Sequence, residues 1–255
     1  MVSDQLASFI HALERDFKLE INVQHQSPAT VVLLPAGYDV GLVYYRTLSF
    51  SVEHQQMLLG RSKVVHIDED LWVHKPSIIL DRVASLLGKA QRIYARDTML
   101  RRIHKADALA FQEKYHLQVA LPGKYRYALF YRETLVSIAV FSGGRKMNEQ
   151  AADYRSFELL RFCHSGNYLV VGGLSKLIKG FVRDFLPGDV MTYVDRDWSD
   201  GENYKKLGFQ EIGKLMPQVF YIEQVLGERR THRPEVPHYT VKNLGSIKMR
   251  VSFKS

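Results

Sequence analysis

Cysteine and long apolar runs are the two features that this sequence of 255 residues lacks most clearly. Cys163 is its one cysteine, which excludes a disulfide within the chain and a zinc site built on several thiolates. No stretch approaches the roughly 20 apolar residues of a membrane-spanning helix. The opening stretch, Met1 to Phe17, carries acidic residues, unlike a signal or transit peptide. We therefore expect a cytoplasmic protein without a membrane segment.

Acidic residues are also comparatively few, because 35 lysines and arginines face 27 aspartates and glutamates. The net charge of +8 favours a polyanionic partner such as nucleic acid, or an anionic cofactor. Much of the excess lies in segments 75–105 and 226–255, and solvated helix faces and a linker are the alternative explanation. The expected nucleic-acid contacts are Arg92, Arg96, Arg101, Arg102, Arg229 and Arg230.

Hydrophobic periodicity predicts a mixed α/β chain. Polar residues over 143–155 predict a loop. Ser3 is the expected cap of the first helix. Helices are expected over 3–17, 52–59, 76–87, 106–115, 173–185 and 201–207. Strands are expected over 29–34, 40–45, 63–67, 100–103, 125–131, 134–141, 157–163, 190–195, 209–213, 218–222 and 247–253.

A double glycine, Gly172 and Gly173, stands between a strand and the helix expected over 173–185. Free N–H groups at a helix start, together with the helix dipole, attract phosphate. Lys176 and Lys179 lie in the first turns and are expected to pair with that phosphate. Alternatively, the glycines only allow the helix to pack closely on the strand.

Charged residues and an aromatic follow the strand expected over 190–195. Asp195 is a candidate to orient or deprotonate an amine, and Trp198, if exposed, is suited to stacking on a base. Alternatively, Asp197 or Ser199 caps a helix and Trp198 fills the core. The candidate substrate-binding residues are Arg196, Trp198, His116 and Arg161.

Four segments in register, FELLRFC, VVGGLSKL, YVDRDWSDG and YKKLGF, resemble the acyl-CoA-dependent N-acyltransferase (GNAT) fold over residues 96–222. The likeness is to GNAT-like domains of phage and mobile-element proteins, to which the phage Mom DNA-modification proteins are related. It implies a mixed twisted sheet with flanking helices, in the succession β-α-β-β-β-α-β-α-β-β.

The resemblance also implies a site for acetyl-CoA or another acyl-CoA. Tyr204 would donate a proton to the leaving thiolate, with Asp195 as the second catalytic residue. Leu169 and Leu174 depart from the arginine or glutamine and the glycine or alanine that the family has at those positions. The implied cofactor-binding residues are Val171, Gly172, Gly173, Leu174, Ser175, Lys176 and Asn203.

Upstream, LLPAGYDVGLVYY and VVHIDEDLW resemble the Vsr-like or homing-endonuclease-like nuclease half of such fusions. Val31 and Val43 stand where the family has metal-binding acids, and apolar side chains cannot ligate magnesium. No metal is therefore expected, although Asp39 lies nearby. These resemblances predict a degenerate nuclease-like α/β domain over 1–95, a GNAT-like domain over 96–225 and a basic extension over 226–255.

The expected function is that of an acyl-CoA-dependent N-acyltransferase acting on a nucleic-acid base or a nucleic-acid-associated amine. The alternative is a non-catalytic protein, built from an inactive nuclease domain and a degenerate GNAT fold, that binds nucleic acid or a partner. A residually active nuclease is a third hypothesis.

Overall fold

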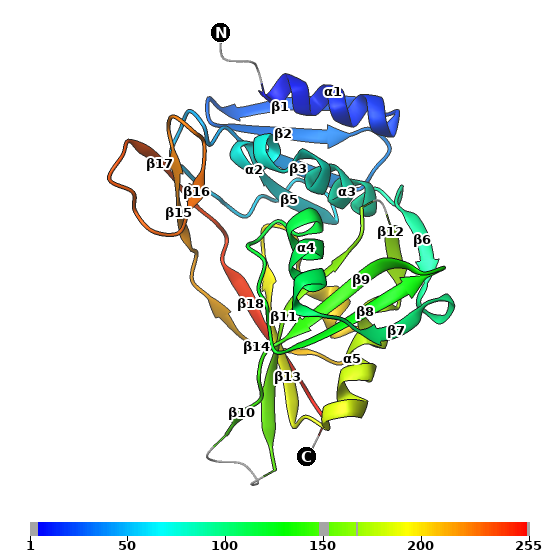
Figure 1. Cartoon of the computed structure of the whole chain (residues 1–255). Coiled ribbons are helices and arrows are strands. Elements are labelled where there is room, and N and C mark those ends of the chain that lie inside the picture. Colours follow the sequence, from blue (N-terminus) through cyan, green and yellow to red (C-terminus); the bar gives the residue numbers. More distant parts are fainter. Residues whose placement is uncertain (1–4, 148–152, 167, 254–255) are drawn as a thin grey trace. The chain divides into compact units, whose positions relative to one another are not determined.

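The computed structural model describes residues 5–147, 153–166 and 168–253, and the chain divides into two compact units (Figure 1). Each unit joins segments that are far apart in the sequence. Unit 1 comprises Met1–Lys89, Asp195–Asp200 and Lys214–Ser246. Unit 2 comprises Ala90–Val194, Gly201–Gly213 and Ile247–Ser255. Segment 226–255, expected as a separate extension, is thus divided between the two units. Ser3 and residues 148–152 of the expected loop lie outside the described residues.

Unit 1 contains a four-stranded sheet whose strand order is β1-β2-β3-β5. All six residues of β3 are buried, as expected for an inner strand of a covered sheet. The strands are β1 (Ile21–Ser27), β2 (Thr30–Pro35), β3 (Val40–Tyr45) and β5 (Lys63–Asp68). The helices are α1 (Gln5–Phe17), α2 (Glu69–His74) and α3 (Pro76–Leu86).

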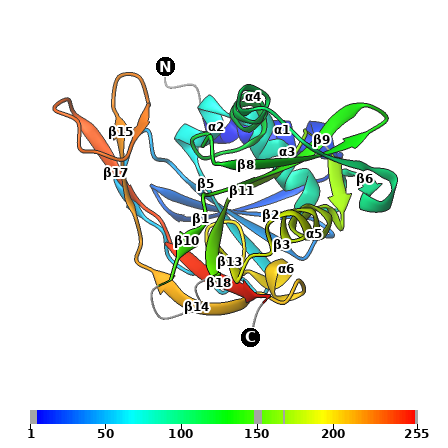
Figure 2. The same cartoon turned by 60° about the horizontal axis from the view of Figure 1, so that its bottom comes forward.

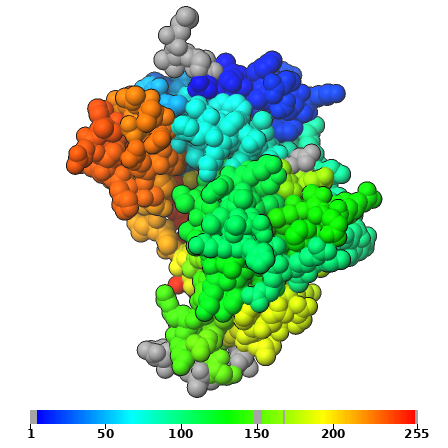
Figure 3. All heavy atoms as spheres, viewed as in Figure 1, coloured from blue at the N-terminus to red at the C-terminus, as the bar shows by residue number. Residues whose placement is uncertain are grey.

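A second sheet of unit 1, ordered β16-β15-β17-β4, is built mainly from residues after 214. Its orange segments adjoin the cyan ones of unit 1 in Figure 3, and His74 Nε2 donates to the carbonyl of Gly227 at 3.1 Å. The strands are β4 (Val52–Glu53), β15 (Val219–Glu223), β16 (Arg229–Arg230) and β17 (His238–Lys242). The helix expected over 52–59 is wrong, because β4 pairs with β17 and His54 N continues that pairing by donating to Lys242 O.

Unit 2 is built on a large mixed sheet with the strand path β14-β18-β13-β11-β9-β8-β7. The α/β class is confirmed. The succession that the resemblance implied is also found, with one difference. The expected last strand, 218–222, lies in the second sheet of unit 1, and β18, which follows the inserted segment 214–246, is the last strand of the large sheet. The strands are β7 (Met99–Arg102), β8 (Tyr125–Tyr131), β9 (Thr134–Phe141), β10 (Arg145–Lys146), β11 (Arg155–His164), β13 (Asp189–Asp195), β14 (Gln210–Leu215) and β18 (Ser246–Ser252). The remaining elements are β6 (Gln91–Tyr94), η1 (Ala95–Asp97), α4 (Lys105–Tyr115), β12 (Tyr168–Val171), α5 (Gly173–Phe185) and α6 (Glu202–Lys205).

Helices α4 and α5 cover opposite faces of this sheet (Figure 2). The apolar stripe predicted for α5 forms the main core, where Phe181 stacks on Phe141 with ring centroids 4.0 Å apart. Gly180 allows this close approach, because a Cβ there would lie 2.3 Å from Leu100. Ala108 and Phe111 of α4 pack on the other face, against β8, β9 and the end of β11.

Two irregularities of β11 bear on the candidate site. Its register with β9 shifts between Leu159 and Arg161, which marks a bulge. Its parallel ladder with β13 spans three residue pairs, of which Glu158 with Met191 is the last, although both strands continue. Thr192 Oγ1 then donates to Leu159 O at 3.0 Å. Beyond this point the facing edges of β11 and β13 are no longer paired with each other.

Candidate functional site

The turn between β12 and α5 has the geometry that the double glycine predicted. Gly172 is the N-cap residue of α5 and has φ 77°, a left-handed conformation that favours glycine. A glycine has no side chain to cap the helix, so the first amides of α5 are left available to an anion. Leu174 is half-buried and packs against the core.

The two lysines of α5 differ from each other. Lys176 Nζ donates to Ala95 O at 2.8 Å and to Thr98 O, so its ammonium is engaged by backbone carbonyls, and its contact with phosphate stays a prediction. These hydrogen bonds link α5 to η1 and the residue after it. Ala95 Cβ lies 3.6 Å from where a Cβ on Gly172 would be, so η1 adjoins the turn. Lys179 is exposed.

Several other predicted residues lie around this part of unit 2. Arg96 follows Ala95 in η1, and its side chain is 80% exposed with its guanidinium over the Tyr94 ring. Arg96 therefore places an exposed guanidinium on the segment next to Gly172, with its Nε 3.9 Å from the carboxylate of Asp97. Val171 is exposed, Gly173 is buried and Ser175 is half-buried.

The end of β11 carries two buried polar atoms, His164 Nδ1 and Ser165 Oγ, that have no hydrogen-bond partner among the described residues. Burial lowers the pKa of His164 to about 4, so its ring is neutral at pH 7. Unsatisfied buried groups carry a free-energy cost and call for an explanation, such as a bound water or ion or a catalytic role. Both residues precede β12 and the Gly172 turn in the chain.

Tyr204 lies in α6, between two glycines of positive φ, Gly201 and Gly208. This matches the predicted helix stop and strand entry. Its half-buried ring packs against the core of unit 2, with its centroid 5.5 Å from that of Phe209. Asn203, beside it, is exposed. The catalytic role of Tyr204 stays a prediction.

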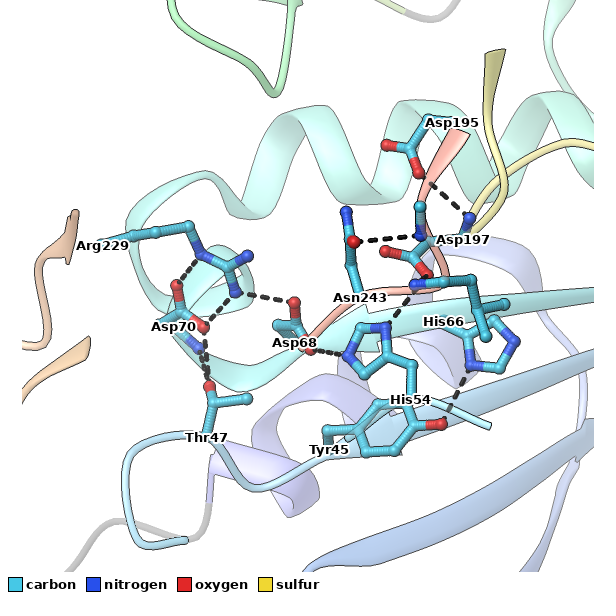
Figure 4. Close-up of polar contacts among 12 residues, drawn as sticks. Tyr45, Thr47, His54, His66, Asp68, Asp70, Asp195, Asp197, Arg229 and Asn243 are labelled. Atoms are coloured by element: carbon cyan, nitrogen blue, oxygen red, sulfur yellow. Dashed lines mark hydrogen bonds and ion pairs between the residues drawn. The ribbon is translucent and has the colours of Figure 1, made fainter. Parts of the chain in front are cut away.

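Unit 1 contains a buried ionic cluster that joins residues from four separate segments (Figure 4). His54 is at its centre, with Nε2 2.7 Å from Asp68 Oδ1 and Nδ1 3.0 Å from Asp197 Oδ1. Each ring nitrogen faces a carboxylate oxygen, so the imidazole carries both protons. Burial opposes this charge, but Asp68 and Asp197 outweigh it and raise the pKa of His54 to about 10.

Arg229 forms the other cationic part of this ionic cluster. Its Nε donates to Asp70 at 2.8 Å, and its terminal nitrogen donates to Asp68 at 2.6 Å. Thr47 Oγ1 donates to Asp70 at 2.6 Å, which completes the coordination of that carboxylate. The guanidinium of Arg229 is thus held by two carboxylates, with 18% of the side chain exposed, and its contact with nucleic acid stays a prediction.

Beside His54, Tyr45 and His66 form a stacked neutral pair. Tyr45 lies 4.2 Å from His54 between ring centroids, and its hydroxyl is 3.0 Å from His66 Nδ1. Burial lowers the pKa of His66 to about 4, so the ring is uncharged at pH 7. The ionic cluster thus holds its positive charge on His54 and Arg229.

The segment after β13 joins this ionic cluster and does not form an exposed recognition site. Asp195 Oδ1 accepts from Asp197 N at 3.0 Å, and burial followed by the charge of Asp197 raises the pKa of Asp195 to about 6. Trp198 is 8% exposed and the Arg82 guanidinium lies 4.2 Å from its ring centre. The prediction of an exposed stacking ring is wrong. The alternative interpretation, a core tryptophan, is what the structure shows.

The remaining predicted substrate-binding residues are engaged by backbone groups. Arg196 donates to Leu244 O at 2.7 Å. Arg161 donates to Leu160 O at 2.7 Å and to Val119 O at 3.1 Å. His116, at the end of α4, accepts from Gln118 N through Nδ1. Their substrate contacts stay predictions.

The predicted basic nucleic-acid contacts divide into paired and exposed residues. Arg101 forms two hydrogen bonds with Glu133, and Arg230 donates to the buried Glu223 and to the exposed Glu228, while both arginines remain exposed. Arg92, Arg96 and Arg102 are exposed, and Arg96 Nε lies 3.9 Å from Asp97 Oδ1. Exposed pairs leave the charge accessible to a ligand, so these five contacts remain predictions.

The positions that resembled a nuclease site are apolar and inaccessible. Val31 and Val43 are each 0% exposed. Among the residues that the structure describes, no group of three or more histidine, cysteine, aspartate or glutamate side chains is placed to hold a metal ion. A surface hollow of about 720 Å³ lies along 233–238 and is lined by none of the predicted site residues. Over the same described ranges, no helix is long and apolar enough to cross a membrane.

Comparison with known proteins gives matches at the level of structure. No family model matches the sequence, and no curated protein sequence matches it. The ribosomal-protein-S18-alanine N-acetyltransferase of Escherichia coli is similar over 62% of this chain and 95% of its own, at 11% identity and a TM-score of 0.41. A GNAT family acetyltransferase of Elizabethkingia anophelis, solved with acetyl-CoA bound, is similar over 62% of this chain and 99% of its own, at 11% identity and a TM-score of 0.40. An N-acetyltransferase of Staphylococcus aureus aligns over 62% and 99%, at 10% identity and a TM-score of 0.39. At these scores the similarities assign no family to the chain.

Proposed function

We propose that unit 2 binds an acyl-CoA and transfers its acyl group to an amine. The observation that carries this proposal is the combination, in one unit, of a glycine-capped helix start and a parallel strand pair whose ladder stops after three residue pairs. The first offers amides to a pyrophosphate. The second offers unpaired strand edges to an extended chain that contains amides, as the arm of coenzyme A does.

Three further features support the anionic end of this ligand site. The exposed Arg96 stands on η1, next to Gly172. The unpartnered His164 Nδ1 and Ser165 Oγ lie at the end of β11, before the turn. The side chain of Leu174 packs into the core, so its departure from the family pattern does not obstruct the amides. Lys176, in contrast, contributes no free charge.

The chemistry asked of the chain is modest. In the transfer, the bond between the acyl carbon and sulfur breaks and a bond between the acyl carbon and the amine nitrogen forms. The amine loses one proton and the thiolate gains one. Tyr204 is the proposed proton donor to the thiolate, because its phenol has a reference pKa of about 10 and a thiol one of about 8.5.

Calorimetric titration of the full chain with coenzyme A and acetyl-CoA tests the binding step. Ser175→Asp places a carboxylate in the first turn of α5 and should weaken binding at least tenfold by repelling phosphate, while suiting the helix dipole. Ala106→Asp makes the same change in the exposed first turn of α4 and should leave binding unaltered. No heat from the wild type at millimolar ligand would overturn the proposal.

The catalytic role of Tyr204 is tested separately by Tyr204→Phe. We expect the acyl-transfer rate to fall at least tenfold with the acetyl-CoA dissociation constant unchanged. If the variant keeps the full rate, Tyr204 only packs against Phe209 and another group protonates the thiolate.

A further inference from the structure

One face of the large sheet changes character along its width. Where α4 covers it, the side chains from β8, β9 and the end of β11 are apolar. The same face continues onto β13 and β18, where it carries partly exposed polar and aromatic side chains. We call this part the open face, and its residues are Arg145, Glu158, Met191, Tyr193, Lys248 and Arg250.

Strand register places these residues on the same face. Glu158 pairs with Met191, while the preceding pair, Phe157 with Val190, lies in the core under α5. Successive side chains alternate between faces, so Glu158, Met191 and Tyr193 point away from α5. On β18, Ile247 and Met249 belong to the α5 core, which puts Lys248 and Arg250 on the open face. Arg145 joins them through its pairing with Ser156.

Cations outnumber anions on the open face. Burial raises the pKa of Glu158, and the charges of Arg161, Arg145 and Lys248 act in the opposite direction. Arg145 and Lys248 belong to the open face, and Arg250 is its third cation and is exposed. The neighbouring Asp189 is buried and held by Tyr154 and Ser156 hydroxyls, at 2.7 and 2.5 Å. With Arg145, Lys248 and Arg250 against Glu158 and Asp189, the open face carries a net positive charge and complements an anion.

The open face also offers a surface for stacking. Tyr193 is 39% exposed and stands two residues from Met191 on the same strand. An aromatic ring among basic side chains on an accessible sheet is the arrangement that binds single-stranded nucleic acid, since the ring stacks on bases and the cations contact phosphates. A duplex offers no splayed base to such a ring.

We propose that the open face binds single-stranded nucleic acid and presents the exocyclic amino group of a base to Glu158. Lys248, Arg250 and Arg145 contact the phosphates and Tyr193 stacks on a base. Glu158 accepts a hydrogen bond from the amino group, which adenine and cytosine have and thymine lacks.

The catalytic extension of this proposal rests on the proposed acyltransferase function. The amino group bound by Glu158 is then the acyl acceptor. One of its N–H bonds breaks and the proton passes to Glu158, while the nitrogen bonds to the acyl carbon and the carbon–sulfur bond of the thioester breaks. Tyr204 supplies the proton that the thiolate takes up.

Fluorescence anisotropy tests the binding surface without any acyl-CoA. Labelled single-stranded oligonucleotides of dA, dC or dT are titrated with the full chain at two salt concentrations. Affinity should fall with salt, with a slope of about −0.7 per phosphate contact on a log–log plot. Lys248→Glu with Arg250→Glu should weaken binding more than tenfold. Arg61→Glu with Lys63→Glu, two exposed cations also spaced by two residues, should change it less than twofold.

Three single variants, at two positions, test how the base is recognised. Tyr193→Ala should weaken binding several-fold and Tyr193→Phe should restore it, because stacking needs only the ring. Glu158→Met removes the acceptor oxygen and should abolish the preference for dA and dC over dT. Equal binding by the charge-reversed variant, or equal affinity of the wild type for dT, dA and dC, would overturn the proposal. Heat from coenzyme A in the same preparation would show that the acyl-CoA site stands independently.

Discussion

The two units place their charges in opposite ways. Unit 1 buries Asp68, Asp70 and Asp197 and pairs them with the buried His54 and with Arg229, whose side chain is 18% exposed. Unit 2 leaves Lys248 and Arg250 on one face of a sheet. In unit 1 each charge has a fixed partner within hydrogen-bond distance, and in unit 2 the cations of the open face can exchange water for a ligand.

This difference separates structural charge from binding charge. A buried ion pair loses its hydration and holds together only when its geometry is good and its remaining hydrogen bonds are made. The ionic cluster meets this condition, because Arg229 contacts two carboxylates and Thr47 completes Asp70. Cations on an exposed surface contribute little to stability and remain free to bind. Removing cations from the two places should therefore have very different effects.

Arg229→Met gives the largest expected effect. The substitution keeps much of the side-chain volume but leaves Asp68 and Asp70 buried without their shared cation. We expect the free energy of unfolding to fall by about 3–5 kcal/mol, the usual cost of breaking a buried pair. Chemical denaturation followed by circular dichroism measures it.

The neighbouring arginine provides the matched control for this substitution. The Arg230 side chain is 49% exposed and pairs with the buried Glu223 and the exposed Glu228, so Arg230→Met should cost less than Arg229→Met, about 1–2 kcal/mol. Adding Asp70→Asn to Arg229→Met should recover part of the loss, because one buried charge is removed. Equal, small losses for both arginine variants would show that the ionic cluster does not hold unit 1 together.

The pH dependence of stability tests His54. Its pKa is raised from 6.5 to about 10 by folding, so its contribution is complete below pH 6.5 and is lost as the pH rises through 10. Between pH 7.5 and 9.5 the unfolded chain has released this proton and the folded chain retains it. The free energy of unfolding should therefore fall by up to about 1.4 kcal/mol per pH unit.

His54→Gln should remove this alkaline slope as well as lower stability at pH 7. Asp195 does not interfere, because the raised pKa of its carboxyl, about 6, places its own effect below this range. His25→Gln, at an exposed position of β1, should leave the slope as in the wild type. A slope that persists in His54→Gln would assign it to other groups.

Local sequence patterns predicted much of the fold. The apolar stripe of α5, the hairpin of β8 and β9 and the helix stop at Gly208 each depend on residues close together in the chain. The helix expected over 52–59 failed because distant residues decide that segment. His54 N bonds Lys242 O, and its ring lies between Asp68 and Asp197.

The candidate sites were predicted less well for the same reason. Arg229 and Arg230 look equivalent in a basic segment. In the structure the Arg229 side chain is 18% exposed and bound to two buried carboxylates, and the Arg230 side chain is 49% exposed. Their difference arises from the insertion of 214–246, which brings β16 beside the acids that end β5. The run of Asp68, Glu69 and Asp70 after an apolar strand was the one signal that marked this place. The Gly172 turn was predicted because a strand, two glycines and an amphipathic helix lie within one short stretch.

Lys176→Met gives the smallest effect and sharpens the comparison within a single helix. Lys176 lies on α5 of unit 2, but like Arg229 it is engaged by fixed acceptors, here the carbonyls of Ala95 and Thr98. Those acceptors are neutral carbonyls, and the Lys176 side chain is only half-buried, so its removal leaves no buried charge without a partner. We therefore expect a loss of about 1–2 kcal/mol in the free energy of unfolding. Lys179→Met, at an exposed position one turn away on the same helix, should change stability by less than about 0.5 kcal/mol.

Because η1 adjoins Gly172, Lys176→Met should also weaken coenzyme A binding, and Lys179→Met should not. If both lysine variants weaken binding equally without loss of stability, Lys176 acts as a ligand-binding charge and the distinction between structural and binding charge does not hold in unit 2.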